Sequence, residues 1–230
     1  MNKNSTDALT PIITQALQLA RAHANDRSTP MPIIGIAGGP GSGKTYFAHK
    51  CKDLLQADGV SVKIIEQDNF LNYNETGFDV IADINPRLKW QQIHEALQQV
   101  KMANKEIKLP FRDKSVRPFT TYYTTVNFAD TDLVLFEGKY ALSGPETFNF
   151  FSYCDFGIFI DANTEIMKKR KIEREMARPA DIRKQAELFE EKLNWGMRMY
   201  EQYILPTKKN ATFVIDNDDI NHVELLQESI

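Results

Sequence analysis

A glycine-rich segment has the residue types and the spacing of a phosphate-binding loop. It reads GGPGSGKT, fits the pattern G-x-x-x-x-G-K-[ST], and lies between an apolar run and a helical pattern. Glycines here let backbone N–H groups turn inward around phosphates, and the following helix N-terminus adds positive potential. The lysine of this pattern reaches the β- and γ-phosphates, and the threonine hydroxyl binds magnesium. We therefore expect a nucleoside triphosphate site built from Gly38, Gly39, Pro40, Gly41, Ser42, Gly43, Lys44 and Thr45.

Two acidic residues follow apolar runs at positions where carboxylates would face that loop. Asp68 comes just after the run 60–66, and Glu137 ends the run that begins at Leu133. Because parallel sheets bind ligands beyond the carboxyl ends of their strands, both side chains are expected beside the phosphates. Asp68 could accept the proton of an attacking hydroxyl or bind magnesium, and Glu137 could orient the magnesium ion. The alternatives are a turn cap for Asp68 and a surface-exposed strand end for Glu137.

The elements that must position these residues alternate between strands and helices. Apolar runs of strand length recur at 32–37, 60–66, 132–136, 156–160 and 212–215. Helical patterns cover 7–24, 43–57, a segment that opens at Asn85–Pro86, 163–178, 184–203 and 221–229. Strand, helix, strand order implies a parallel sheet. We predict an α/β fold, a three-layer P-loop NTPase sandwich with a mostly parallel central sheet, in one domain over 1–230 with an N-terminal helix in 1–28.

The bulk composition argues against several classes of function. Lys and Arg number 28 and Asp and Glu 31, so a net charge of −3 gives no reason to expect nucleic-acid or membrane-surface binding. Cys51 and Cys154 lie far apart, without disulfide or zinc spacing, and no apolar stretch is long enough to span a bilayer. The acidic segment 216–219 lacks the glycine and final glutamate of a calcium loop. We expect a cytoplasmic protein with a small-molecule substrate; a homo-oligomer is compatible with the sequence.

Together the motifs resemble the phosphoribulokinase and uridine kinase family. The resemblance rests on GGPGSGKT, QDNF, LVLFEG, IFIDANTE, an R-x-x-x-R helix and ILPTKK, and it covers residues 33–215. It implies a kinase that uses ATP and Mg²⁺ to phosphorylate a hydroxyl group of a small metabolite. It also implies that Asp68 is the catalytic base, that Glu137 helps to hold magnesium, and that Lys44 stabilises the transferred group. The helix at 166–178 would lead into a helical lid at about 170–190.

Three arginines of that helix are spaced by four residues and line one helical face. The resemblance implies a catalytic role for Arg174 and for Arg178, which could approach the transferred phosphoryl group. Arg178 precedes Pro179, whereas the family usually has Arg-Gly. For Arg170 we prefer a solvated basic face offset by neighbouring glutamates.

Lysine and arginine residues occupy the positions at which the family's nucleoside kinases carry the neutral and acidic residues that bind the nucleoside. Uridine kinases resemble H-P-D-A-F-D-W before the third helix; here the segment reads NPRLKW, and a lysine stands opposite the final Asp. The Y-D-F-x-x-H segment is matched by RDK and a later arginine. Cations suit a carboxylate or phosphate on the acceptor, as in a sugar phosphate, a hydroxy acid or a pantothenate-like compound. The candidate substrate-binding residues are Lys89, Arg112, Lys114 and Arg117.

Several alternatives remain open at this point. The cations could form an ordinary charged surface, and the protein would then be a uridine or cytidine kinase. A P-loop nucleotide hydrolase would use water as its acceptor, and a nucleotide-binding regulatory protein would bind without turnover. The retained pair of acids argues against the regulatory protein, and the lid resemblance argues against the hydrolase.

Overall fold

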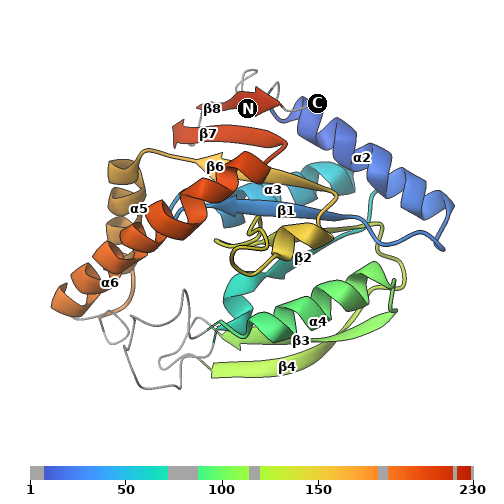
Figure 1. Cartoon of the computed structure of the whole chain (residues 1–230), viewed down its shortest axis with the longest axis horizontal. Helices are drawn as coiled ribbons and strands as arrows, with labels where there is room; N and C mark the ends of the chain where they lie inside the picture. Colours follow the sequence, from blue (N-terminus) through green and yellow to red (C-terminus); the bar gives the residue numbers. More distant parts are fainter. Residues whose placement is uncertain (1–7, 72–87, 114–119, 181–185, 220–221, 229–230) are drawn as a thin grey trace.

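A six-stranded sheet with helices on both faces forms the centre of the computed structural model (Figure 1). The structure describes residues 8–71, 88–113, 120–180, 186–219 and 222–228. The strand order is β2-β5-β1-β6-β7-β8, with β8 antiparallel to β7 and the other neighbours parallel. The strands are β1 (Ile33–Gly38), β2 (Val62–Glu66), β5 (Leu133–Glu137), β6 (Phe156–Asp161), β7 (Phe213–Asp219) and β8 (His222–Glu228). The predicted α/β fold with a mostly parallel sheet is confirmed.

Alternate residues of each inner strand pack into two separate apolar cores. In β1, Ile34 and Ile36 face the core that α2 (Thr10–Asn25) and α3 (Lys44–Ala57) cover. Ile33 and Ala37 face the opposite core, to which α4 (Trp90–Lys101) and α6 (Ala186–Met199) contribute. Because such strands are buried on both faces, they read as continuous apolar runs, and the sequence pattern identified them.

The helix predicted at 221–229 is wrong, because β8 occupies most of this segment. It pairs antiparallel with β7, with Ile215 opposite Leu225. Leu225 packs on the core beside β7, whereas Leu226 is exposed. Two adjacent leucines that point to opposite faces fit a strand, but so short an apolar pattern does not distinguish a strand from a helix.

The third predicted helix, α4, begins later than expected. Asn85 and Pro86, the predicted N-cap and first turn, lie outside the described residues. Leu88 forms an antiparallel bridge with Leu71, and Lys89 is the N-cap of α4. Pairing with the end of the QDNF segment therefore holds Leu88 out of the helix.

A two-stranded antiparallel sheet that the sequence pattern did not predict lies beside α4 (Figure 1). Its strands are β3 (Glu106–Asp113) and β4 (Thr120–Asn127). Ile107 and Leu109 of β3 are buried. The alternation of apolar and polar residues is short, however, because Pro110 interrupts it and charged residues flank it at Glu106 and Arg112. β4 carries mainly threonine and tyrosine, which fit a strand without giving an apolar pattern.

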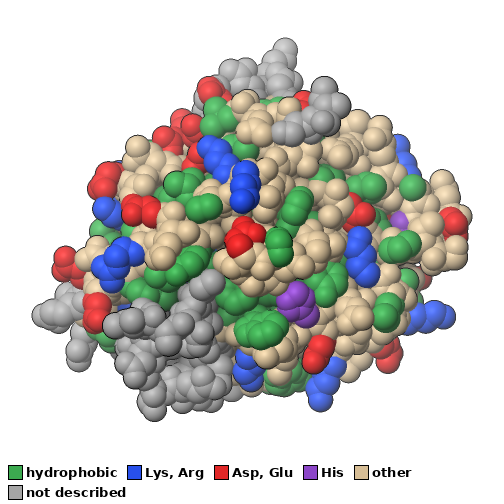
Figure 2. Space-filling view, in the orientation of Figure 1, with side chains coloured by type: hydrophobic (Ala, Val, Ile, Leu, Met, Phe, Trp, Pro, Cys, Tyr) green, Lys and Arg blue, Asp and Glu red, His purple; other side chains and the backbone are tan. Residues whose placement is uncertain are grey.

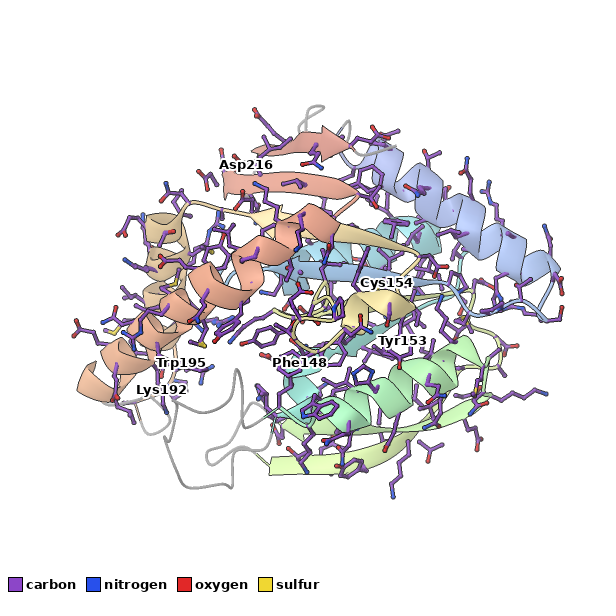
Figure 3. The ribbon with its side chains drawn as sticks, in the orientation of Figure 1. Phe148, Tyr153, Cys154, Lys192, Trp195 and Asp216 are labelled. Carbon is purple, nitrogen blue, oxygen red and sulfur yellow. The ribbon has the colours of Figure 1, made fainter. Side chains whose placement is uncertain are left out.

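An aromatic cluster joins α4 to the main sheet. His94 of α4 packs on Phe150 and Tyr153 of the short helix η2 (Phe150–Tyr153), and its Nδ1 lies 3.0 Å from the Tyr153 hydroxyl. Figure 3 labels Tyr153 and Phe148 of this cluster. Phe148 stacks on Phe150. These contacts fix α4, and with it Lys89 at its N-terminus, relative to the sheet.

The remaining elements lie towards the carboxyl ends of the parallel strands or follow α6. They are η1 (Gln67–Phe70), α5 (Thr164–Met176), the π-helix η3 (Tyr200–Ile204) and the 3₁₀ helix η4 (Leu205–Asn210). No helix among the described residues is both long and apolar enough to cross a bilayer. On the face drawn in Figure 2, positive and negative side chains are interspersed.

Candidate active site

The glycine-rich loop connects β1 to α3 and closes around its own lysine. Lys44 Nζ donates a hydrogen bond of 2.8 Å to the carbonyl oxygen of Gly39. Gly43 is the N-cap of α3 with φ of +101°, and Gly41 has φ of +97°, values that side chains other than glycine rarely adopt. The eight residues predicted to bind the nucleotide run from the last residue of β1, Gly38, through this loop into the first turn of α3.

α5 and α6 pack directly against this loop. A Cβ atom on Gly41 would lie 2.5 Å from the carbonyl oxygen of Met167 and 3.1 Å from Cγ of Lys171, both on α5. A Cβ atom on Gly196 of α6 would lie 3.9 Å from the Pro40 ring. The loop therefore has one wall made by the helix that carries Arg174, and Arg178 lies just beyond the end of that helix.

The ends of two resemblance motifs meet beside the loop. Asp161, the last residue of β6, accepts hydrogen bonds from Lys208 Nζ at 2.7 Å and from the Tyr200 hydroxyl at 3.4 Å. Tyr200 and Met167 also pack against Gly39. The IFIDANTE and ILPTKK segments are thus joined through Asp161 and Lys208, and Asp161 also bonds the tyrosine that packs on Gly39.

Thr45 and Glu137 form the second part of the site. Glu137 ends β5, opposite Ile36 of β1, and is only 4% exposed. The Thr45 hydroxyl donates to Glu137 Oε1 at 3.0 Å. Burial raises the pKa of Glu137 to about 7, although the charge of Lys44 opposes this shift. The alternative of a surface-exposed strand end does not hold for Glu137.

Four further charged groups lie close enough to Lys44 to influence its pKa. Burial lowers the pKa of Lys44 to about 8. The carboxylates of Glu137 and Asp68 oppose the shift, while Lys139 and Arg174 add to it. The predicted catalytic residues Asp68 and Arg174 therefore both lie close enough to Lys44 to influence its charge.

Asp68 lies in η1, just beyond the end of β2, as the sequence predicted. Its Oδ2 lies 3.9 Å from Nη2 of Arg112, and the backbone N–H of Arg112 donates to Asn69 Oδ1 at 3.4 Å. On the other side of η1, the backbone N–H of Lys89 donates to the Phe70 carbonyl at 3.0 Å. Arg112 therefore lies beside the expected base, and the backbone of Lys89 contacts the same short helix.

Arg112 does not behave as an ordinary surface charge. It is 6% exposed, whereas arginine side chains are mostly solvated. A buried guanidinium is costly unless anions and hydrogen-bond acceptors surround it. The other two candidate substrate residues, Lys114 and Arg117, lie outside the described residues.

The three arginines on α5 and just after it have different surroundings. Arg174 is exposed in the last turn and acts on Lys44. Arg178 Nε lies 3.5 Å from Oε2 of the buried Glu175, so its catalytic role stays a prediction. Arg170 donates from Nη2 to the Asp218 carbonyl at 2.9 Å. This hydrogen bond links α5 to β7, so Arg170 is not simply part of a solvated basic face.

Two residues near the loop were missed by sequence reasoning. Lys171 lies against Gly41, and it is three residues before Arg174, a spacing that also shares a helical face. The spacing of four residues that joins Arg170, Arg174 and Arg178 does not include Lys171. Asn217 donates to the Ser42 carbonyl at 2.6 Å, and no local pattern could have connected residues so distant in sequence.

Comparisons with known proteins agree with this geometry. A sequence model described as the Phosphoribulokinase / Uridine kinase family matches residues 89–224, and a second, Chromatin associated protein KTI12, matches the shorter segment 31–107. Uridine kinase of Macrococcus caseolyticus is 30% identical over 202 residues, covering 84% of this chain and 91% of the relative. Uridine kinase of Halobacterium salinarum is 28% identical over 209 residues, covering 87% of each chain.

Solved structures show the same fold at low sequence identity. D-glycerate 3-kinase from Cryptococcus neoformans aligns with a TM-score of 0.66 at 16% identity, covering 94% of this chain and 99% of the other. Phosphoribulokinase from Rhodobacter spheroides aligns with a TM-score of 0.62 at 15% identity, covering 81% and 70%. The chain therefore belongs to the phosphoribulokinase and uridine kinase family and is an ATP-dependent small-molecule kinase whose acceptor group is a hydroxyl.

Proposed function

We propose that this kinase transfers the γ-phosphoryl group of Mg-ATP to a hydroxyl of an anionic metabolite, such as a sugar phosphate, a hydroxy acid or a pantothenate-like compound. One observation carries the proposal: the buried guanidinium of Arg112 lies 3.9 Å from the carboxylate of Asp68. Five N–H donors let one guanidinium contact Asp68 and a second anion together. An acceptor held in this way would present its hydroxyl to the base.

The residues of the loop and of η1 divide the chemistry between them. Lys44 and the backbone N–H groups of the loop bind the phosphates. Asp68 takes the proton of the acceptor hydroxyl while that oxygen bonds to the γ-phosphorus and the bond to the leaving oxygen of ADP breaks. Arg174 and Arg178, in a lid at about 170–190, would stabilise the charge on the transferred group; residues 181–185 of that range lie outside the described part of the chain.

Thr45 and Glu137 fit a magnesium ion. Their oxygens are 3.0 Å apart, and a buried carboxylate whose pKa is raised to about 7 is stabilised by a nearby cation. Within the described ranges, no group of three or more His, Cys, Asp or Glu could hold a metal alone. Mg²⁺ keeps waters and uses one or two carboxylates with substrate phosphates, which fits one hydroxyl and one carboxylate at this point. When bound, it neutralises phosphate charge; we assign Thr45 and Glu137 as ligands, with Asp68 beside them.

A uridine or cytidine kinase is the second candidate, because relatives at up to 30% identity carry the name uridine kinase. The two readings differ at Lys89 and Arg112, whose charges suit an anion rather than a neutral ribose. A hydrolase would release ADP without any metabolite, and a regulatory protein would bind ATP without turnover. The proposal places the reaction in the cytoplasm, with no nucleic-acid or membrane partner.

The test measures acceptor-dependent ADP release with phosphorylated sugars, hydroxy acids, pantothenate, uridine and cytidine. An anionic alcohol should be the best acceptor. Arg112→Met and Lys89→Ala should each raise the KM for that acceptor about 10- to 150-fold, since a charge-assisted hydrogen bond is worth roughly 1.5 to 3 kcal/mol. The KM for ATP should stay unchanged.

Lys108→Ala is the matched control, because Lys108 lies on the exposed side of β3, over the Tyr123 ring. It should change neither KM. Lys89 is partly exposed, so its variant tests the idea even if replacement of the buried Arg112 prevents folding. Efficient phosphorylation of uridine, with no response to either variant, would identify an ordinary uridine kinase.

A further inference from the structure

The end of β7 connects the phosphate loop with the start of α5. The buried side chain of Asn217, 4% exposed, donates from Nδ2 to the Ser42 carbonyl oxygen at 2.6 Å. The next residue, Asp218, accepts the backbone N–H of Asn163, the N-cap of α5, at 2.5 Å. Its carbonyl also accepts from Arg170 Nη2 at 2.9 Å. Two consecutive residues therefore contact the loop and the helix beside it.

The Asn217 amide fixes the orientation of one peptide of the loop. In a trans peptide the C=O and the following N–H point in opposite directions. Because the Ser42 carbonyl is directed towards β7, the Gly43 N–H is directed away from it. The same side chain also borders the Gly43 backbone, where a Cβ atom would lie 2.3 Å from Asn217 Nδ2.

The surroundings of Asn217 hold it in place on both sides. Before it, Asp216 pairs with Asp161 in the β6–β7 ladder. After it, the backbone N–H of Asp218 donates to Asp216 Oδ1 at 2.8 Å, where the register of the β7–β8 ladder shifts between Asp216 and Asp219. Figure 3 shows Asp216 on β7, on the side of the sheet from which α5 begins. The amide therefore projects from a rigid support.

We propose that Asn217 is a positioning residue for the phosphate loop, which acts through the Ser42–Gly43 peptide without contacting the nucleotide. The inference rests on the nucleotide role proposed above for the loop. With the amide present, the Gly43 N–H faces the site as an anion donor. Without it, the peptide can rotate and turn the Ser42 carbonyl towards the phosphates, where its partial negative charge repels them.

The test uses tripolyphosphate, which carries the anionic groups of ATP without the nucleoside. Calorimetry measures its Kd and that of ATP for the wild-type chain and for Asn217→Ala. Both Kd values should rise by the same factor, about tenfold, the scale expected when a buried hydrogen bond is lost. A nucleoside contact would instead weaken the binding of ATP alone.

Asn210→Ala is the matched control, because Asn210 donates from Nδ2 to the Leu142 carbonyl at 2.9 Å, just before β7 begins. It removes the same kind of hydrogen bond away from the loop and should leave both Kd values unchanged. Urea midpoints for the two variants measure the structural cost separately from phosphate binding.

Each outcome decides the inference. A folded Asn217→Ala protein that binds tripolyphosphate as well as the wild type overturns it, and so does a loss confined to ATP. A wild-type chain that binds neither ligand overturns the nucleotide role of the loop together with the inference. If Asn217→Ala does not fold, Asn217→Leu, which keeps the branched shape without the donor, is measured with the same criteria.

Discussion

At the scale of single residues, burial brings the charges of Lys44 and Glu137 close to their titration points. Burial lowers the pKa of Lys44 to about 8 and raises that of Glu137 to about 7. Glu137 gains a proton as the pH falls below about 7, and Lys44 loses one as it rises above about 8. We expect kcat/KM for Mg-ATP to be bell-shaped, with its maximum between these values and limbs approaching tenfold per pH unit. Steady-state kinetics from about pH 5 to about pH 10 would check this.

Two comparisons test the acidic and the alkaline limb of this pH profile separately. Glu137→Gln should remove the acidic limb, because the amide does not titrate, while lowering activity throughout. The profile of kcat at saturating Mg-ATP should lose its alkaline limb, since bound phosphates favour the protonated lysine. A flat kcat/KM profile between about pH 6 and about pH 9 would contradict the assignment of both groups.

The residues that the sequence could predict are those whose partners are local or whose position follows from strand order. The phosphate loop is one continuous motif, and Asp68 and Glu137 follow strands whose carboxyl ends share one edge. The burial of Arg112 depends on a hairpin that packs beside η1, and the role of Asn217 depends on a partner 175 residues earlier. Neither contact produces a periodic pattern in the sequence, so each can be recognised only in the folded structure.

At the scale of elements, the close approach of α5 to the loop makes glycine necessary at Gly41. Its φ is +97°, and a Cβ atom would meet the Met167 carbonyl, which cannot move without α5. We expect Gly41→Ala to lower kcat/KM for ATP by at least about tenfold, because the loop or the helix must shift. A left-handed alanine also costs roughly 1 to 2 kcal/mol of stability.

Gly59→Ala provides the control for that cost. Gly59 has φ of +81°, but a Cβ atom there meets nothing within 4 Å. Gly59→Ala should lose only the stability that the left-handed conformation costs, whereas Gly41→Ala should lose at least as much in urea unfolding because of the clash with Met167. Only Gly41→Ala should lose activity. Equal activity in the two variants would show that contact between α5 and the loop is unimportant for turnover.

The elements themselves were predictable where both faces are buried and less so elsewhere. The five parallel strands and the helices before α4 follow from apolar runs and helical spacing. β3, β4 and β8 are antiparallel and partly exposed, and β4 carries residues that suit a pleated surface without an apolar period. Their formation depends on neighbours, such as the open edge of β7.

At the scale of the whole molecule, a buried histidine should make stability depend on pH. His23 near the end of α2 is 2% exposed; burial, with help from Arg27, lowers its pKa, while Asp132 and Asp26 oppose the shift. Arg27 also forms an ion pair with Asp132, the residue before β5, with 2.5 Å between Nη2 and Oδ1. The unfolded chain then binds the proton more readily, so the free energy of unfolding falls as the pH drops below about 6.5.

Urea midpoints at about pH 5.5 and about pH 8 would measure this dependence. We expect His23→Gln to reduce the loss at the lower pH, because the glutamine does not titrate. His49→Gln is the control, since His49 is exposed on α3, and it should keep the wild-type dependence. An identical loss in the His23 and His49 variants would assign the pH effect to other groups.

The order of strands in the central sheet has a consequence for synthesis on the ribosome. β1 and β2 are the first described strands to be made, yet they are not neighbours, because β5 lies between them. β6, the neighbour of β1 on its other side, is synthesised later still. An emerging chain that has reached α4 therefore carries two apolar strands with no strand partner, and non-local pairing of this kind is slow and exposed to aggregation. We expect the nascent chain to be most exposed to aggregation in the interval before β5 emerges.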